Sequence, residues 1–158
     1  MDTVEGRLAR AGLTLPPAVG TRFGYRPIVI DGTNAYLAGQ LAKGVGDAIA
    51  HPGIVGREID LQTARGVARD CALQALAWLK HELGTLTKVQ RVLRLNGYVR
   101  VASPEGFGQM SEVIDGASEV FVTAFDDTGH HVRSVLGLAD LPRHASVMID
   151  LTVRIDSG

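Results

Sequence analysis

Nine residues near the C-terminus, Val147–Ile155, alternate regularly between two kinds of side chain. Because successive side chains of a β-strand point to opposite faces, this period of two predicts a strand that has one face in the core. The opposite set includes Met148, Asp150 and Thr152. The core-facing set is wholly aliphatic and comprises Val147, Ile149, Leu151, Val153 and Ile155. The chain is therefore expected to fold around a sheet, with Asp150 facing away from its own core.

Two long stretches follow a helical period and predict the layer that covers this sheet. Apolar residues recur at steps of three and four over residues 61–83, between Asp60 as an N-terminal cap and Gly84 as a stop. A second apolar stripe runs over residues 110–124. A short N-terminal helix is expected over residues 3–11.

The remaining apolar runs predict four more strands. Two of them, residues 28–30 and 35–37, flank a turn-forming tetrapeptide and favour a hairpin. The other two cover residues 89–101 and 132–140. The expected order is β-β-α-β-α-β-β, an α+β fold in which two long helices pack on one face of a mixed sheet.

Size and composition indicate how this sheet is covered. A chain of 158 residues with 46% hydrophobic residues is long enough for one core, so we expect a single domain over residues 1–158 with its core at about 25–155. Two helices cover only one face of a sheet, and the other face still carries Met148. A partner subunit is its natural cover, which would place a site between subunits. The irregular loop 43–58 is typical of a segment that serves a site or an interface.

Charge and cysteine content exclude several classes of function. The formal net charge of −1 gives no basic excess to neutralise phosphates, so nucleic acid is an unlikely partner. Cys71 is the only cysteine, which excludes an internal disulfide and favours a small buried side chain over a nucleophile. The first ten residues lack an apolar signal core and no later run is long enough to span a bilayer, so no membrane association is expected and the cytoplasm is the default location.

Arg133 is the first candidate for a functional role. It lies in a largely apolar strand, where an unpaired guanidinium is costly, so it requires an anion. Asp150 is expected on the neighbouring strand. Two interpretations remain equally open from the residues alone: a structural ion pair with Asp150 or another acid, and a bidentate clamp for the carboxylate of a ligand.

Histidine and serine residues give weaker signals. His130 and His131 stand beside Asp126 and Asp127, but adjacent histidines in a turn lack the spacing of metal ligands, so a solvated turn is favoured and no metal is expected. The serines lie in no nucleophile-elbow context, and phosphate-binding and dinucleotide-binding glycine motifs are absent. The serines considered are Ser103, Ser111, Ser118 and Ser134.

Two segments carry a resemblance to a known family. The segment Arg133-Ser-Val-Leu-Gly-Leu-Ala-Asp-Leu-Pro142, followed by Val147-Met-Ile-Asp-Leu, resembles the C-terminal signature of the reactive intermediate deaminase (Rid) family. This family is also called the YjgF family and is often labelled endoribonuclease L-PSP. Tyr25-Arg-Pro-Ile-Val-Ile-Asp-Gly-Thr-Asn-Ala-Tyr-Leu-Ala-Gly-Gln40 resembles its N-terminal signature. The resemblance runs from about residue 25 to residue 153, with two motifs in the right order.

The resemblance implies a fold, an assembly and an activity. The family has a chorismate-mutase-like α+β fold and forms homotrimers with ligand clefts between subunits. Its deaminating members hydrolyse enamine and imine acids to 2-keto acids and ammonia, without a metal or cofactor. By resemblance, Arg133 matches the arginine that binds the carboxylate of the substrate, a small metabolite. Tyr25 matches a cleft tyrosine, Gly39 a backbone contact, and Val135 a position whose main chain meets the substrate.

Three positions depart from the pattern that this resemblance implies. Asp150 stands where a water-positioning glutamate is usual, and we expect it to orient or activate water as the second catalytic residue. Asp115 stands where an asparagine is common and brings a second negative charge toward an anionic substrate. Ala38 replaces a frequent serine.

Three hypotheses follow for the function. The leading one is an enamine/imine deaminase at clefts between subunits, because positioning and a charge clamp are enough for an intrinsically easy hydrolysis. The alternative is a non-catalytic protein that binds a small carboxylate or 2-keto acid on the same trimeric scaffold, and the residues at positions 38, 115 and 150 favour it. RNA cleavage is the least supported, because the chain has no basic excess.

Overall fold

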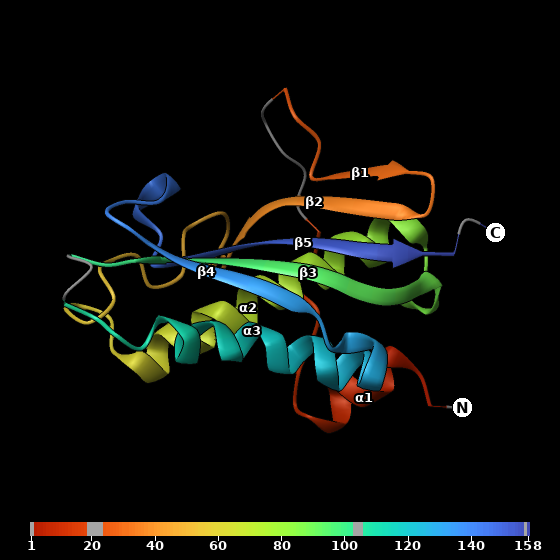
Figure 1. Cartoon of the computed structure of the whole chain (residues 1–158), viewed down its shortest axis with the longest axis horizontal. Coiled ribbons are helices and arrows are strands. Elements are labelled where there is room, and N and C mark those ends of the chain that lie inside the picture. The colour runs from red at the N-terminus through yellow and green to blue at the C-terminus, as the bar shows by residue number, and fades with distance from the viewer. Residues whose placement is uncertain (1, 19–23, 103–105, 157) are drawn as a thin grey trace.

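The computed structural model is a five-stranded sheet with helices against one face (Figure 1). It describes residues 2–18, 24–102, 106–156 and 158. The strands are β1 (Ile28–Asp31), β2 (Asn34–Leu41), β3 (Val89–Arg100), β4 (Val132–Leu138) and β5 (Val147–Ile155). The helices are α1 (Val4–Arg10), α2 (Leu61–Leu83) and α3 (Met110–Phe125), with short 3-10 turns η1 (Leu86–Lys88), η2 (Asp126–Gly129) and η3 (Pro142–His144). The predicted element order and α+β class are confirmed.

The strands lie in the order β1-β2-β5-β3-β4, and only β3 and β4 are parallel. The predicted hairpin is confirmed as β1 and β2. Strand β2 extends beyond the predicted residue 37 to Leu41, because it continues to pair with β5 after a bulge between Leu37 and Gln40. Helix α3 connects β3 to β4 as a crossover, and such a connection returns the chain parallel to the strand that it left.

This topology corrects the expected relation between Arg133 and Asp150. Their strands, β4 and β5, are not neighbours, because β3 lies between them. Leu95 of β3 pairs with Arg133 on one side, while Asn96 of β3 pairs with Asp150 on the other. Consecutive residues of a strand face opposite ways, so the two candidate residues lie on opposite faces of the sheet.

Helix α2 forms as its capping signals predict. The side chain of Asp60 accepts a hydrogen bond of 2.8 Å from the backbone N–H of Thr63, and this bond lowers the pKa of Asp60. The helix ends at Gly84, which adopts a left-handed φ of 78°. Cys71 is fully buried in the α2 layer, and burial raises the pKa of its thiol to about 12. The prediction of a small buried side chain at this position is confirmed.

Two glycines allow α3 to pack closely against both α2 and β3. A Cβ atom at Gly116 would collide with the backbone carbonyl of Arg65 on α2, and a Cβ atom at Gly97 would lie 2.5 Å from Ile114. Any larger residue at these two positions would push α3 away from α2 or from β3. The position of α3 above the edge of the sheet is thus set by two close contacts.

No helix covers the opposite face of the sheet in the part of the chain that the structure describes (Figure 1). The register places Leu136, Tyr98 and Met148 in one row across β4, β3 and β5 on this face. Several large apolar side chains here remain about half exposed or more: Val29 51%, Tyr36 46%, Val132 60% and Leu136 47%. Asp150 lies on the same face, so the prediction that it points away from the core is confirmed.

The predicted irregular loop 43–58 forms isolated β-bridges but no helix or strand. It is fixed to the connection between β4 and β5, because Arg143 donates to the backbone carbonyl of Asp47 at 2.5 Å and Gly53 N–H donates to the carbonyl of His144 at 3.0 Å. Arg143 and His144 both have positive φ values, 59° and 58°. Within the described ranges, no helix combines the length and apolar character that crossing a bilayer requires.

Candidate functional site

The guanidinium of Arg133 lies between β4 and α3, at the edge of the sheet. Its Nη1 is 2.8 Å from Oδ1 of Asp115 and donates to Oγ of Ser118 at 3.0 Å. Its Nη2 donates to the backbone carbonyl of Ser111 at 3.1 Å. All three partners are on α3. The ion pair that the sequence left open is therefore present, and its acid is Asp115 rather than Asp150.

Arg133 is held by α3 but is not closed off. Its side chain keeps 23% of its surface exposed, and that of Asp115 keeps 42%. A guanidinium has five N–H donors, and the described contacts with Asp115, Ser118 and Ser111 account for three of them. Within the described residues, two donors therefore remain for a ligand, which is the number that a carboxylate takes in a bidentate pair.

Asp150 has a different environment on the other face. Its Oδ1 accepts from Nδ2 of Asn96 at 2.8 Å, and its Oδ2 accepts from the hydroxyl of Tyr98 at 2.7 Å. The hydrogen bond to Asp150, together with burial, raises the pKa of Tyr98 to about 12. Each carboxylate oxygen of Asp150 thus has a protein donor within its own chain.

The residues of the N-terminal signature belong to β1, β2 and the segment before them, on the side of the sheet away from β4. Gly39 is inside β2 at the bulge, rather than at a strand end, and a Cβ atom there would lie 2.7 Å from the sulfur of Met148. Tyr25 precedes β1 and is 54% exposed. Three strand spacings separate β2 from β4, which amounts to about 14 Å. Of the other predicted site residues, Asp115 and Val135, which is two residues along β4, lie near Arg133.

His131 is a functional candidate that the sequence reasoning missed. Its Nδ1 is 2.6 Å from the carbonyl oxygen of Gly129, and its Nε2 is 2.9 Å from Oγ of Ser118. Its ring meets that of Phe121 edge-on with centroids 5.9 Å apart. The predicted solvated turn is wrong for His131, which is half-buried, although His130 is exposed as expected. The available signal was its spacing of two from Arg133, which puts both on one side of an extended chain.

The surroundings of His131 favour its neutral form. Burial is the largest cause that lowers the pKa of His131, and the positive charges of Arg133 and His130 lower it further. The carbonyl of Gly129 acts in the opposite direction. No group of three His, Cys, Asp or Glu residues that could hold a metal is found among the residues the structure describes.

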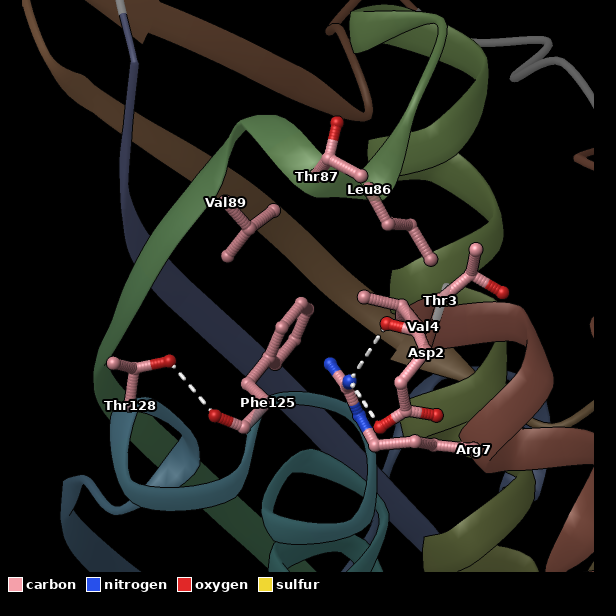
Figure 2. Close-up of a pocket in the computed structure, with 9 residues that line it drawn as sticks. All are labelled: Asp2, Thr3, Val4, Arg7, Leu86, Thr87, Val89, Phe125 and Thr128. Atoms are coloured by element: carbon pink, nitrogen blue, oxygen red, sulfur yellow. Dashed lines mark hydrogen bonds and ion pairs between the residues drawn. The ribbon is translucent and has the colours of Figure 1, made fainter.

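A pocket elsewhere in the fold contains structural contacts rather than this cluster (Figure 2). It lies between α1, η1, η2 and the ends of α3 and β3. Arg7 lines it and donates two hydrogen bonds, of 3.0 and 2.6 Å, to the carbonyl of Ala124. It donates two more to Asp2, at 3.2 Å to the backbone carbonyl and at 3.1 Å to Oδ2. Arg7 thus satisfies a carbonyl in the last turn of α3 and fixes α1 to that helix.

Three comparisons relate the chain to known proteins. Residues 5–154 match the family model described as "YjgF/chorismate mutase-like, putative endoribonuclease". Protein TCP17 of Trypanosoma cruzi is 33% identical over 156 residues, which are 98% of this chain and 95% of that protein.

Solved structures show the same fold. Atu1372 of Agrobacterium tumefaciens, a protein of unknown function, is 42% identical with a TM-score of 0.88, and the match covers 98% of this chain and 95% of that one. A protein from Shewanella oneidensis MR-1 that is named "putative endoribonuclease" is 25% identical with a TM-score of 0.90. The match covers 97% of this chain and 99% of that one. RidA from a Psychrobacter species, at 20% identity and a TM-score of 0.59 over 87% and 94%, shares the fold.

Proposed function

The chain belongs to the YjgF/chorismate mutase-like family, and from this premise we propose that it hydrolyses imine and enamine acids to 2-keto acids and ammonia. The observation that carries the proposal is the guanidinium of Arg133, which is fixed by α3 yet keeps part of its surface exposed and two N–H donors for a ligand. A bidentate pair with the substrate carboxylate would place the adjacent imine carbon at the β4 edge. The fixed cation then reduces the entropy cost of bringing water and carbon together.

The second part of the proposal is a homotrimer whose clefts complete the site. Within one chain, Gly39 on β2 and Tyr25 before β1 are on the other side of the sheet's centre from Arg133, and Asp150 lies on the opposite face. They can meet the same ligand only if a neighbouring protomer supplies one set. The uncovered face with its exposed apolar side chains supports such an assembly. In this cleft Val135 and Gly39 offer backbone groups, and Asp150 orients water.

A competition assay tests the activity. An amino-acid oxidase generates the imine, semicarbazide traps it, and an active protein lowers the yield of semicarbazone. We expect Arg133→Ala to lose most of this effect, because the carboxylate loses its partner. Arg69→Ala is the matched control, since Arg69 is an exposed arginine on α2 whose described contact is with Asp70. No effect of the wild-type protein, or equal effects of the wild-type protein and Arg133→Ala, contradicts the proposal.

A second function is favoured by one observation, the contact of 2.8 Å between Arg133 and Asp115. A carboxylate already beside the cation weakens its hold on a second anion and could tune the site for reversible binding. The chain would then be a non-catalytic sensor of a small carboxylate or 2-keto acid. Calorimetric titration with pyruvate separates the two functions: heat of binding that Arg133→Ala abolishes, with no turnover of imines, supports the sensor.

A further inference from the structure

The cluster of Arg133, Ser118 and His131 has a fixed direction of hydrogen bonding. The carbonyl of Gly129 can only accept, so Nδ1 of His131 carries a proton. In the neutral ring Nε2 is then an acceptor, and the hydroxyl of Ser118 is its donor. Oγ of Ser118 in turn accepts from Arg133, which can only donate. The hydrogen bonds therefore run from Arg133 through Ser118 to His131.

The ring of His131 is held in this orientation by a tight turn. Gly129 lies so close to α3 that a Cβ atom on it would collide with the carbonyl of Phe121. This close approach brings the carbonyl of Gly129 to Nδ1, while the ring of Phe121 packs edge-on against the imidazole. One nitrogen of His131 is thus anchored, and the other is directed at Ser118.

The neutral ring is the form that this network accommodates. If Nε2 also carried a proton, Oγ of Ser118 would face two cationic donors, His131 and Arg133. The charged and titratable groups around His131 are Arg133 on β4 and the adjacent His130, while Asp115 on α3 is bonded to Arg133. Burial and both positive neighbours lower the pKa of His131, so its Nε2 is free to accept a proton at neutral pH.

We propose that Ser118 and His131 form a proton relay for the imine hydrolysis proposed above, on which this inference rests. Ser118 contacts the attacking water, which lies beside the carboxylate held by Arg133, and His131 acts through Ser118 as a positioning residue. Ser118 is on α3 and half-buried, and its hydroxyl is oriented by the bonds to Arg133 and His131.

The chemistry balances for a protonated imine. The water oxygen forms a bond to the imine carbon, and the π electron pair moves to nitrogen. The proton released by the water passes to Oγ of Ser118 as the hydroxyl proton of Ser118 moves to Nε2 of His131. His131 returns this proton through Ser118 to the amino group. The carbon–nitrogen bond then breaks. The hydroxyl group that water added to the carbon loses its proton to the departing ammonia, which gives ammonium and the 2-keto acid.

The test measures kcat and KM of imine hydrolysis across pH for the wild-type protein, Ser118→Ala and His131→Gln. We expect kcat to fall about 100-fold in both variants, with KM little changed, because Arg133 still binds the carboxylate. The wild-type kcat should decline at acid pH, where His131 is protonated, and His131→Gln should lack this decline. Ser134→Ala and His130→Gln are the controls for kcat at neutral pH: Ser134 lies on the opposite face of β4, and the exposed His130 acts on His131 only through its charge at acid pH.

Each outcome separates the relay from the activity itself. Wild-type turnover with unchanged kcat and an unchanged acid limb in both variants overturns the relay and leaves the proposed function standing. No turnover by the wild-type protein overturns both. The thermal unfolding of each variant is measured alongside. A fall in kcat that goes with unfolding of the variant at the assay temperature would assign the pair a structural role and also overturn the relay.

Discussion

The two polar clusters of this sheet differ in what they leave unused. On the uncovered face, each oxygen of Asp150 accepts one hydrogen bond from a side chain of β3, which fixes the carboxylate and leaves further acceptor sites on it. At the α3–β4 edge, Arg133 retains N–H donors and His131 is held as a neutral base. Groups that are oriented by the protein and keep unused donors or acceptors can bind and react. The edge therefore offers donors and a base, for carboxylate binding and proton transfer, while the face offers an oriented carboxylate for water and the apolar side chains for assembly.

Leu136→Asp is expected to have the largest effect, because it should separate the subunits. Leu136 is 47% exposed on the uncovered face, so a carboxylate there can stay hydrated in a free protomer but not in a subunit interface. Sedimentation equilibrium should change from three times the 16.8 kDa of one chain to a single chain. Imine turnover should fall with it, since the cleft would be incomplete.

Val45→Asp is the matched control for this change. Val45 is 97% exposed in the loop 43–58, so its replacement should leave the mass unchanged. A wild-type protein that sediments as a monomer would remove the assembly from the proposal. Dissociation by Val45→Asp but not by Leu136→Asp would move the interface from the sheet face to the loop.

Asp150→Ala is expected to have the next largest effect, on stability. It leaves the hydroxyl of Tyr98 and the amide of Asn96 without their half-buried acceptor, which costs about 1–3 kcal/mol. Asp150→Asn keeps an acceptor oxygen and should cost less, while a loss of kcat in this variant would show that the carboxylate serves the cleft. Urea unfolding at constant oligomeric state measures the difference, and equal stabilities of all three proteins would contradict a stabilising role for these two hydrogen bonds.

Local patterns determined most of the fold in advance. The cap at Asp60, the stop at Gly84 and the alternation of β5 each depend on neighbours in sequence, and all are observed. The order of the strands was not predictable in the same way. Alternation states which face a side chain occupies but not which strand lies beside it, so β5 was expected next to β4 although β3 separates them.

In the candidate site, too, local sequence predicted some residues, while others depend on contacts between distant segments. Arg133 was identified because a cation in an apolar strand demands an anion, and the family motif supplied its expected role. Its actual partner, Asp115, is 18 positions away on a helix, so no local period connects the two residues. His131 and Ser118 were passed over for the same reason: their contact exists only because Gly129 brings η2 close to α3.

The smallest expected effect is the dependence of stability on acid pH through His131. Burial, Arg133 and His130 lower the pKa of His131 in the folded chain, so below the ordinary pKa of histidine the unfolded chain binds a proton that the folded chain resists. The contribution of His131 is therefore complete above that pKa and is lost as the pH falls toward the lowered folded value. His131→Gln should lose less stability than the wild-type protein between pH 7.5 and about pH 5, and His130→Gln should keep most of the wild-type dependence, because burial is the largest cause of the lowered pKa. Urea unfolding at these two pH values measures the difference. Identical pH dependence in the wild type and His131→Gln would mean that the edge holds no restrained neutral base, and its contrast with the uncovered face would then rest on Arg133 alone.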